Sequence, residues 1–495
     1  MHLVSGSYLI CITEVSGNYT IQRCYITVRE TDIDTTFTLN DVIEVLGFGK
    51  FHVKLTVAVG LTWMADAIAV TLLAVLGPSI QCYWNLSEEE VAVVSTCVFI
   101  GMFFGCPFWG FICDRFGRKV TVIISVIWIA LFGLVNSVVP HYLWLLTSMT
   151  IQGFGVAGVG QSVTLYSEFL PASYRASGII FINVFYVIGN IFSVLLAYFT
   201  LKSLGWRIFT LLCGSPIVIV SVFMWWLPES PRYLVAVGNY KEAFNILKRV
   251  AKTSMKDLPE GHLHSHDNGE SKNRGKFLEL LQCEHRRTTL ILWLLWFTAI
   301  FSYYGVILLT NVLLSKPDCY VSNSDFKRAV QNTTVQCHVV ESDNYIKYLI
   351  TVLGEIPGLL LTFFLVEKIG RKPTLVLFFF ISSLLVTSLQ LCLNRKVLVL
   401  LIFGMRAFIT GIVQTVYLYT PEVYPTHIRA IGLGTAAGFS RLGAIVTPYV
   451  SQVIIQETPG IAIFIYSLLL FLCIGGSLLL SKETKGMQLQ DHDDH

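Results

Sequence analysis

The chain has 495 residues, of which 54% are hydrophobic and only 14% are charged, and its mean hydropathy is +0.65. This composition excludes an ordinary soluble domain and predicts an all-α protein that crosses a lipid bilayer many times. The formal net charge is +3, and the Lys and Arg residues cluster in separate loops, so no exposed basic face that could bind nucleic acid is expected. The sequence contains no Walker loop, no nucleophile motif and no large soluble segment, which argues against an enzyme; neither a cofactor nor a metal is expected.

The first segment, residues 1–53, is expected to be cytoplasmic. No basic region precedes its short apolar stretch, which argues against a cleaved signal peptide. From Asn40 to Leu46 the apolar residues recur on one side of a helix, and Gly47 and Gly49 follow as stop signals. We predict a short amphipathic helix at the membrane surface.

Twelve apolar runs of membrane-spanning length follow this segment. The predicted spans are 54–77, 90–112, 119–139, 142–168, 177–199, 206–227, 289–313, 346–366, 373–392, 397–419, 430–455 and 459–480. They define two six-helix halves, residues 54–227 and 289–480, with a central linker at 228–288 and a tail at 481–495. His262, His264 and His266 alternate in the linker, where a solvated segment explains them better than a metal site does.

The distribution of Lys and Arg sets the predicted orientation. The central linker and the loops on its side carry most of these residues, which places both termini in the cytosol. The sequons that begin at Asn85 and Asn332 then lie on the far side, where glycosylation is possible. Cys319 and Cys337 share a loop on that side, and a disulfide and two free thiols are equally compatible with the sequence.

A polar loop interrupts the hydrocarbon-like sequence between the second and third spans. Residues 110–119 read GFICDRFGRK, with four charges within six positions. We expect Asp114 to accept from backbone amides at the start of a neighbouring helix, and Gly110 and Gly117 to allow close backbone approach. Arg115 and Arg118 are expected to remain on the cytoplasmic side.

The two halves repeat the same motifs. DRFGRK at 114–119 recurs as EKIGRK at 367–372, and SEFLPASYR ending at Arg175 recurs as PEVYPTHIR ending at Arg429. The offset is 253 residues for the first motif and 254 for the second, and PESPR at 228–232 has a weaker echo in KETKG at 482–486. Two repeated six-helix units predict a cavity at their interface, opened by one half rocking against the other.

These motifs resemble the sugar-porter and organic-ion branch of the major facilitator superfamily. Within it, FGKF at 48–51, WMADA at 63–67 and YTPEVYP at 419–425 are similar to the synaptic vesicle two-related proteins. The resemblance covers roughly residues 38–488 and departs at Met149, where many relatives have an arginine. It implies a charge-linked cytoplasmic gate formed by Gly110, Asp114, Arg115, Gly117, Arg118, Glu168, Arg175, Glu367, Arg371, Glu422 and Arg429.

Four ionisable residues fall near the centres of their spans: Asp66, Glu355, Arg406 and Arg441. A charge at the bilayer centre is costly unless it is paired or faces a wet cavity, so each is a candidate site for substrate or protons. Two interpretations remain open, because Glu355 and Arg406 could equally pair and only lock their helices. Asp66 is the leading candidate, and Arg441 lies where related organic-anion carriers have a positive charge.

Polar and aromatic side chains on apolar helices are suited to orienting a small solute, although helix packing explains aromatic residues equally well. The candidates are Trp63, Gln161, Tyr303, Tyr304, Gln414 and Tyr417. The glycine run at 153–160, GFGVAGVG, superficially matches a dinucleotide fingerprint. No strand is predicted before it, so close packing of small residues between helices is the better interpretation.

The sequence therefore predicts a secondary transporter that moves a small organic solute, an organic ion or a zwitterion, by alternating access. Proton coupling through Asp66 is part of this hypothesis. The alternative is a receptor or vesicle-trafficking protein that retains a transporter fold. The expected partners are the solute, the bilayer and protons; a monomer in a vesicle or plasma membrane is expected to suffice.

Overall fold

In a computed structural model of the chain, the described residues are 7–16, 19–28, 36–37, 39–256, 258, 262–263, 277–315, 342–391 and 393–485. Strands β1 (Ser7–Ser16) and β2 (Tyr19–Val28) form an antiparallel hairpin, and β3 (Thr36–Phe37) pairs in parallel with β4 (His262–Leu263). These strands were not predicted from the sequence. Asn332, Cys319, Cys337, His264 and His266 lie outside the described residues, so the predictions made for them stay predictions.

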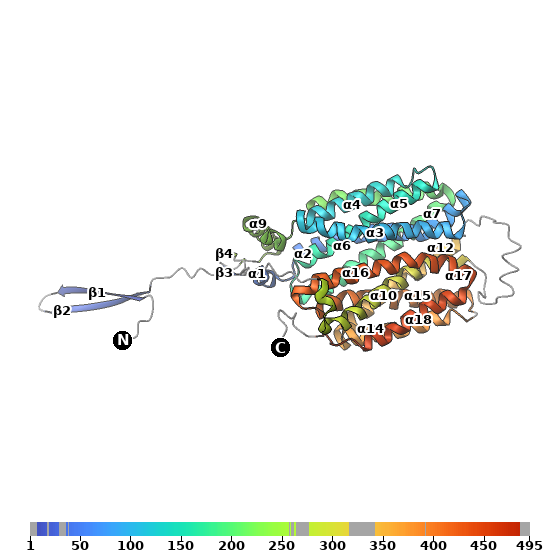
Figure 1. Cartoon of the computed structure of the whole chain (residues 1–495). Helices are drawn as coiled ribbons and strands as arrows, with labels where there is room; N and C mark the ends of the chain where they lie inside the picture. Colours follow the sequence, from blue (N-terminus) through green and yellow to red (C-terminus); the bar gives the residue numbers. More distant parts are fainter. Residues whose placement is uncertain are drawn as a thin grey trace.

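The N-terminal half is a bundle of long helices (Figure 1). Its elements are α2 (Lys50–Trp84), α3 (Glu88–Phe116), α4 (Arg118–Val135), α5 (Tyr142–Val156), η1 (Ala157–Val159), α6 (Gly160–Ser167), α7 (Ala172–Phe223) and η2 (Met224–Trp226). Ser87 begins α3 with a reciprocal cap: its hydroxyl accepts from the Glu90 amide at 3.3 Å, and the Glu90 carboxylate accepts from the Ser87 amide at 2.8 Å. Asn85 ends α2 with φ +53° and is exposed, as its predicted glycosylation requires.

Helix α7 is long enough to cross a membrane twice. Gly205 has φ +81°, a conformation that glycine adopts without a steric penalty, and it divides the helix at the boundary between the fifth and sixth predicted spans. Length and apolarity alone identify ten spanning helices among the described residues, and α7 is one of them. The predicted span 430–455 is not among the ten, although this stretch is helical in the structure. Counting α7 twice and adding this stretch gives the twelve predicted crossings.

The C-terminal half repeats the arrangement. Its elements are α10 (Cys283–Ser315), α12 (Ser342–Leu353), α13 (Glu355–Ile369), α14 (Arg371–Ser388), α15 (Arg395–Val423), α16 (Thr426–Pro448), the π-helical η5 (Tyr449–Ile454), α17 (Ile455–Glu457) and α18 (Pro459–Leu478). Gly354 separates α12 from α13 within one predicted span. The halves meet where α16 and η5 pack on α3 and where α12 and α13 pack on α7.

Shorter helices gather at one end of the bundle. They are α1 (Leu39–Leu46), α8 (Pro231–Ala236), α9 (Tyr240–Ser254) and η4 (Phe277–Leu281). Helix α1 packs on α9, so the predicted amphipathic helix forms but has a protein partner for its buried residues Val42, Ile43 and Leu46. We call this end of the bundle the α9 end (Figure 1).

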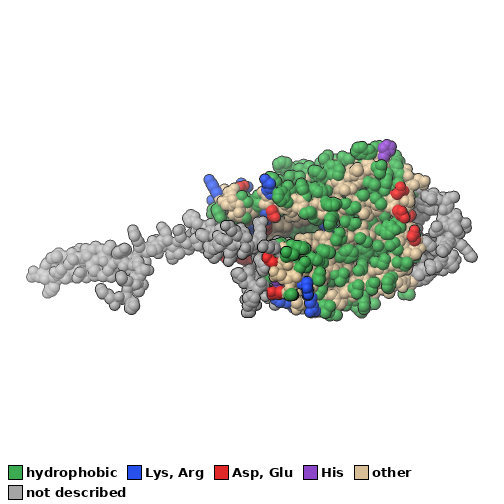
Figure 2. Space-filling model, in the orientation of Figure 1, with side chains coloured by type: hydrophobic (Ala, Val, Ile, Leu, Met, Phe, Trp, Pro, Cys, Tyr) green, Lys and Arg blue, Asp and Glu red, His purple; other side chains and the backbone are tan. Residues whose placement is uncertain are grey.

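The surface of the bundle is that of a membrane protein. Large apolar side chains such as Phe104, Phe199 and Phe364 are exposed along its length. On the face shown in Figure 2, hydrophobic side chains cover the middle of the bundle, while Lys and Arg lie at the α9 end. Figure 2 also shows a recess between the two halves at that end.

Gly153, Gly155 and Gly158 of the glycine run at 153–160 lie in close helix packing, as predicted, whereas Gly160 faces open space. A Cβ on Gly153 would meet the backbone carbonyl of Val98, and one on Gly101 would meet the carbonyl of Thr150, so α3 and α5 approach each other backbone to backbone. The close backbone approach predicted for Gly110 in the polar loop was wrong, because a Cβ there would meet only open space.

Candidate functional site

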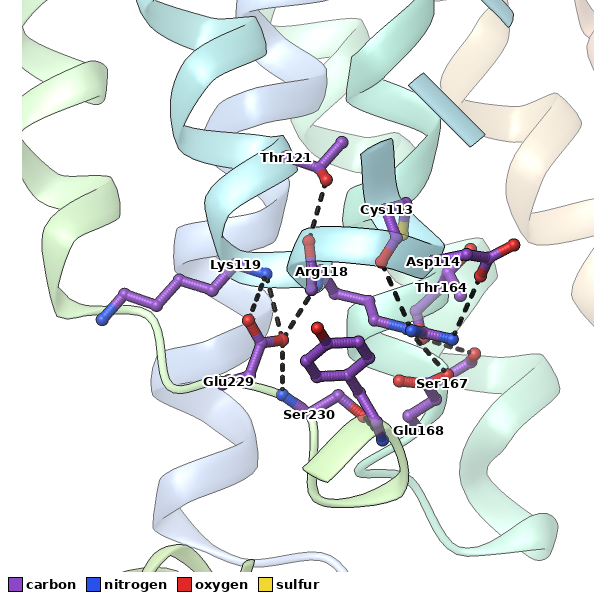
Figure 3. A network of polar contacts seen from close by, with 12 residues as sticks. Cys113, Asp114, Arg118, Lys119, Thr121, Thr164, Ser167, Glu168, Glu229 and Ser230 are labelled. Carbon is purple, nitrogen blue, oxygen red and sulfur yellow. Dashed lines mark hydrogen bonds and ion pairs between the residues drawn. The ribbon is translucent and has the colours of Figure 1, made fainter. Parts of the chain in front are cut away.

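Arg118 is the centre of a charged network at the α9 end of the N-terminal half (Figure 3). Its guanidinium lies 3.4 Å from the Glu168 carboxylate and 3.7 Å from that of Asp114, and it stacks over the Tyr233 ring at 5.1 Å. The network joins the end of α3 and the start of α4 to the end of α6 and to α8. It therefore fixes the relative positions of these segments.

Glu229, in the PESPR motif, binds the start of α4. Its carboxylate accepts from the backbone amides of Arg118 at 2.9 Å and Lys119 at 3.2 Å (Figure 3). A carboxylate is favoured there because the first amides of a helix lack partners and carry partial positive charge. Gly117 has φ +98°, and a Cβ at this position would collide with the Glu229 carboxylate.

The C-terminal half contains the same arrangement. Arg371 donates to both carboxylate oxygens of Glu422 at 3.0 Å, and Glu483 accepts from the amides of Arg371 at 2.8 Å and Lys372 at 2.9 Å. Glu229 and Glu483 are 254 residues apart, as Glu168 and Glu422 are. The weak sequence echo between PESPR and KETKG therefore marks equivalent sites.

The structure changes the roles predicted for several of these residues. Glu229, rather than Asp114, accepts from the backbone amides, and Glu367 is exposed. Arg115 is also exposed and lies over the Phe116 ring at 5.6 Å.

The two arginines that end the repeated motifs differ from Arg118 and Arg371 in their surroundings. Arg429 donates to the carbonyl of Tyr424 at 3.2 Å, and Arg175 has a buried Nε without a hydrogen-bond partner among the described residues. Arg118 and Arg371 supply the predicted ion pairs with Glu168 and Glu422 instead.

Replacing Glu229 or Glu483 with Gln is expected to lower the free energy of unfolding by about 1–2 kcal/mol. Each substitution removes a charge that a helix N-terminus stabilises. The pseudo-symmetry predicts similar losses in the two halves, measured by unfolding of the purified protein in mixed micelles. Glu367→Gln is the control, with an expected change below about 0.5 kcal/mol because Glu367 is exposed. Equal losses for all three would contradict this assignment.

A polar cavity lies between the two halves. The space that the centres of water molecules can occupy is about 80 Å³, several times what one water needs. Its walls come from α2, α6 and α7 on one side and from α10, α13, α15 and α16 on the other. Eight of the predicted site residues line it: Trp63, Asp66, Tyr303, Tyr304, Glu355, Gln414, Tyr417 and Arg441.

Glu355 and Arg406 form a buried ion pair within the C-terminal half. The Arg406 Nη1 donates to Glu355 Oε1 at 2.9 Å, and the two side chains are 3% and 1% exposed. Arg406 also lies over the Tyr348 ring at 5.0 Å, and Asn190 of the other half donates to Glu355 Oε2 at 3.1 Å. The sequence left pairing and a solute site as alternatives; the structure shows the pair and also places Glu355 in the cavity wall.

Asp66 and Arg441 face the same cavity from opposite halves. No ion pair within 4.0 Å among the described residues includes either of them. Asp66 Oδ1 and Arg441 Nε are both buried without a hydrogen-bond partner. These two charges are therefore available to a ligand.

Two candidates do not line the cavity. Gln161 lies on α6, whose Val163 contributes to the wall, but is not itself a lining residue. Arg406 pairs with the lining residue Glu355 but does not line the cavity itself.

Two further polar residues of the interface, Asn183 and Asn190 on α7, were not predicted from the sequence. Asn183 donates to Gln414 across the interface at 3.0 Å. Asn190 donates to Glu355 and accepts from the hydroxyl of Thr71 at 2.7 Å, so it links these two residues. Two amides seven residues apart in an apolar run were the available signal, since that spacing puts both on one face of a helix.

The fold and the site together define the class: a twelve-span, two-half membrane protein of the major facilitator type with a charged cavity between its halves. The family model for "Sugar (and other) transporter" matches residues 53–324 and 333–494. The chain therefore belongs to this family of transporters.

Curated relatives extend the match over nearly the whole chain. It is 43% identical to the "Synaptic vesicle 2-related protein" of Rattus norvegicus over 460 residues, 92% of this chain and 83% of the relative. It is 41% identical to the "Putative transporter svop-1" of Caenorhabditis elegans, covering 94% of this chain and 88% of the relative. The "Putative transporter SVOPL" of Homo sapiens is 34% identical, with 92% and 93% covered.

Among solved structures, the inward-open xylose transporter XylE from E. coli superposes with a TM-score of 0.64. The match covers 88% of this chain and 98% of that one at 17% identity. A likeness at this identity shows the fold, and the predicted major facilitator architecture is confirmed.

Proposed function

We propose that the protein carries a small organic solute across a membrane by alternating access. The observation that carries this proposal is the cavity with unpaired charges, to which both halves contribute. A site at the interface of two repeated halves changes its exposure when one half rocks against the other. The family and the two relatives named as putative transporters support the same function.

The arrangement of the halves is that of one state in such a cycle. At the end opposite α9, α12 packs on α7 and η5 packs on α3, while the recess in Figure 2 lies at the α9 end. The Lys and Arg residues at the α9 end support its assignment to the cytosol. The names of the relatives support a vesicle membrane.

The charged networks around Arg118 and Arg371 are part of this proposal. Each joins segments of a single half, so each half can move as a unit. We infer that they keep the α9 ends of the helices in register while the interface between the halves opens and closes.

Uptake into proteoliposomes tests the proposal. With a panel of radiolabelled amino acids, amines, carboxylates and hexoses, the wild-type protein is expected to accumulate at least one compound above protein-free liposomes. Asp66→Asn should reduce that uptake to background, because the cavity loses one of its two free charges. A proton gradient should change wild-type uptake if Asp66 also binds the coupling proton.

The matched control is Asp343→Asn. Asp343 is exposed, pairs with Lys347 and is not among the residues that line the cavity, so uptake should be retained. Identical signals with and without protein for every compound would favour the receptor or trafficking alternative.

A further inference from the structure

We propose that the cavity binds a small zwitterion, with its ammonium group at Asp66 and its carboxylate at Arg441. This inference rests on the proposed function and names its substrate class. It starts from the charges of the cavity. Glu355 and Arg406 neutralise each other at 2.9 Å, which leaves one acid and one base without a partner.

A ligand with a single charge would leave one of these two groups unneutralised. Asp66 and Arg441 are close enough to influence each other electrostatically, but they form no ion pair within 4.0 Å. An uncompensated charge near the middle of a membrane is energetically unfavourable. A molecule with both charges compensates both groups at once and keeps the cavity neutral.

The surroundings of Asp66 suit a cation. Trp63 lies one helical turn before it on α2, and the Trp63 ring is 6.1 Å from that of Tyr186, which is 6.3 Å from that of Tyr303. The electron-rich faces of such rings attract ammonium groups.

The surroundings of Arg441 suit a carboxylate. Tyr304 and Tyr417 line the cavity and lie within electrostatic reach of the guanidinium, so phenol and guanidinium donors converge there. The contact from Arg441 Nη1 to the Met102 sulfur at 3.4 Å is weak competition for an anion. A carboxylate carries one charge, which a single arginine neutralises, whereas a phosphate would bring about two.

The two ends belong to different halves, and this links binding to movement. Asp66 lies on α2 of the N-terminal half and Arg441 on α16 of the C-terminal half. A zwitterion therefore contacts both halves through its two ends and favours the conformation in which they are closest. A singly charged analogue makes an ionic contact with one half only. The space of about 80 Å³ limits the ligand to a small molecule.

Binding of matched compounds to the purified full chain tests the assignment. The probes are ω-amino acids from glycine to 6-aminohexanoate, each compared with the amine and the carboxylate of equal chain length. Dissociation constants come from thermal stabilisation at rising concentration. At one chain length or more, the zwitterion should bind at least tenfold more tightly than either singly charged analogue.

Two variants assign the ends. Asp66→Asn should weaken the zwitterion about 30-fold or more and leave the carboxylate analogue bound; Arg441→Gln should weaken the zwitterion equally and leave the amine analogue bound. Asp343→Asn and Arg207→Gln remove the same kinds of charge away from the cavity and should bind the zwitterion as the wild type does.

The proposal is overturned if no zwitterion binds, if a singly charged analogue binds as tightly at every chain length, or if both cavity variants bind like the wild type. The experiments distinguish failure of this proposal from failure of the proposed function. Uptake of a singly charged solute without zwitterion binding would contradict the zwitterion proposal but support transport. Zwitterion binding without uptake would contradict transport but support the zwitterion proposal.

Discussion

Replacing Arg406 with Met is expected to lower the free energy of unfolding by about 3–5 kcal/mol, because it leaves the Glu355 carboxylate buried without its ion-pair partner. The pair is well placed to show the full effect. Both side chains are at most 3% exposed, and the 2.9 Å contact is supported by Asn190 from the opposite half. Glu355→Gln should cause a loss of similar size, since it leaves the arginine charge uncompensated.

The double variant Glu355→Gln/Arg406→Met separates the cost of an unpaired charge from the value of the pair. With both charges removed, most of the lost stability should return, because a buried pair contributes little beyond its own desolvation cost. Unfolding in mixed micelles of rising denaturing-detergent content measures all three variants as a double-mutant cycle. A double variant that is less stable than either single variant would contradict this prediction, because additive losses mean that the two residues stabilise the bundle independently of each other.

The sequence predicted the bundle well, because a membrane imposes simple demands on a chain. Each span must be apolar and long enough to cross the hydrocarbon layer, so the predicted limits agree with the helices to within a few residues at most ends. The charges at the centres of spans were equally visible. Placing Asp66, Glu355 and Arg441 in one cavity followed from the repeat and the burial cost together.

Features that depend on contacts between distant segments were less accessible. Glu229 and Glu483 bind the first amides of α4 and α14, more than 100 residues earlier in the chain, and their motifs do not reveal which helix they reach. Asp114 was the local candidate for this role. For Arg406 the sequence named pairing with Glu355 as one of two interpretations, and the packing of α13 on α15 shows that this pair forms.

The elements outside the membrane-spanning bundle were not predicted for a different reason. Helix α9 and the β1–β2 hairpin are not apolar enough to resemble spans, and their short amphipathic patterns are weak beside the twelve long apolar runs. Helix α9 buries Ile246, Leu247 and Val250 against neighbouring helices, which only the tertiary structure shows. Local sequence patterns therefore predicted the membrane part better than the parts outside it.

Replacing Gly153 with Ala is expected to destabilise the N-terminal half by about 3 kcal/mol or more. The new methyl group would meet the backbone of Val98, and a backbone cannot move aside as the end of a side chain can. The helices α3 and α5 would have to separate to remove this clash. Their separation would also weaken the close contact between Gly101 and Thr150, which lies in the same interface. The melting temperature of the purified protein measures the loss.

The same glycine run contains its own controls. At Gly155 a methyl group would meet the Trp128 ring, a side chain with some freedom to shift, so the loss should be smaller than at Gly153. At Gly160 it would meet open space on a helix, and Ala should be neutral or stabilising by about 0.4–1 kcal/mol through lower entropy of the unfolded chain. Equal losses at the three positions would contradict the assignment, because the close approach to α3 is made at Gly153 and not at Gly160.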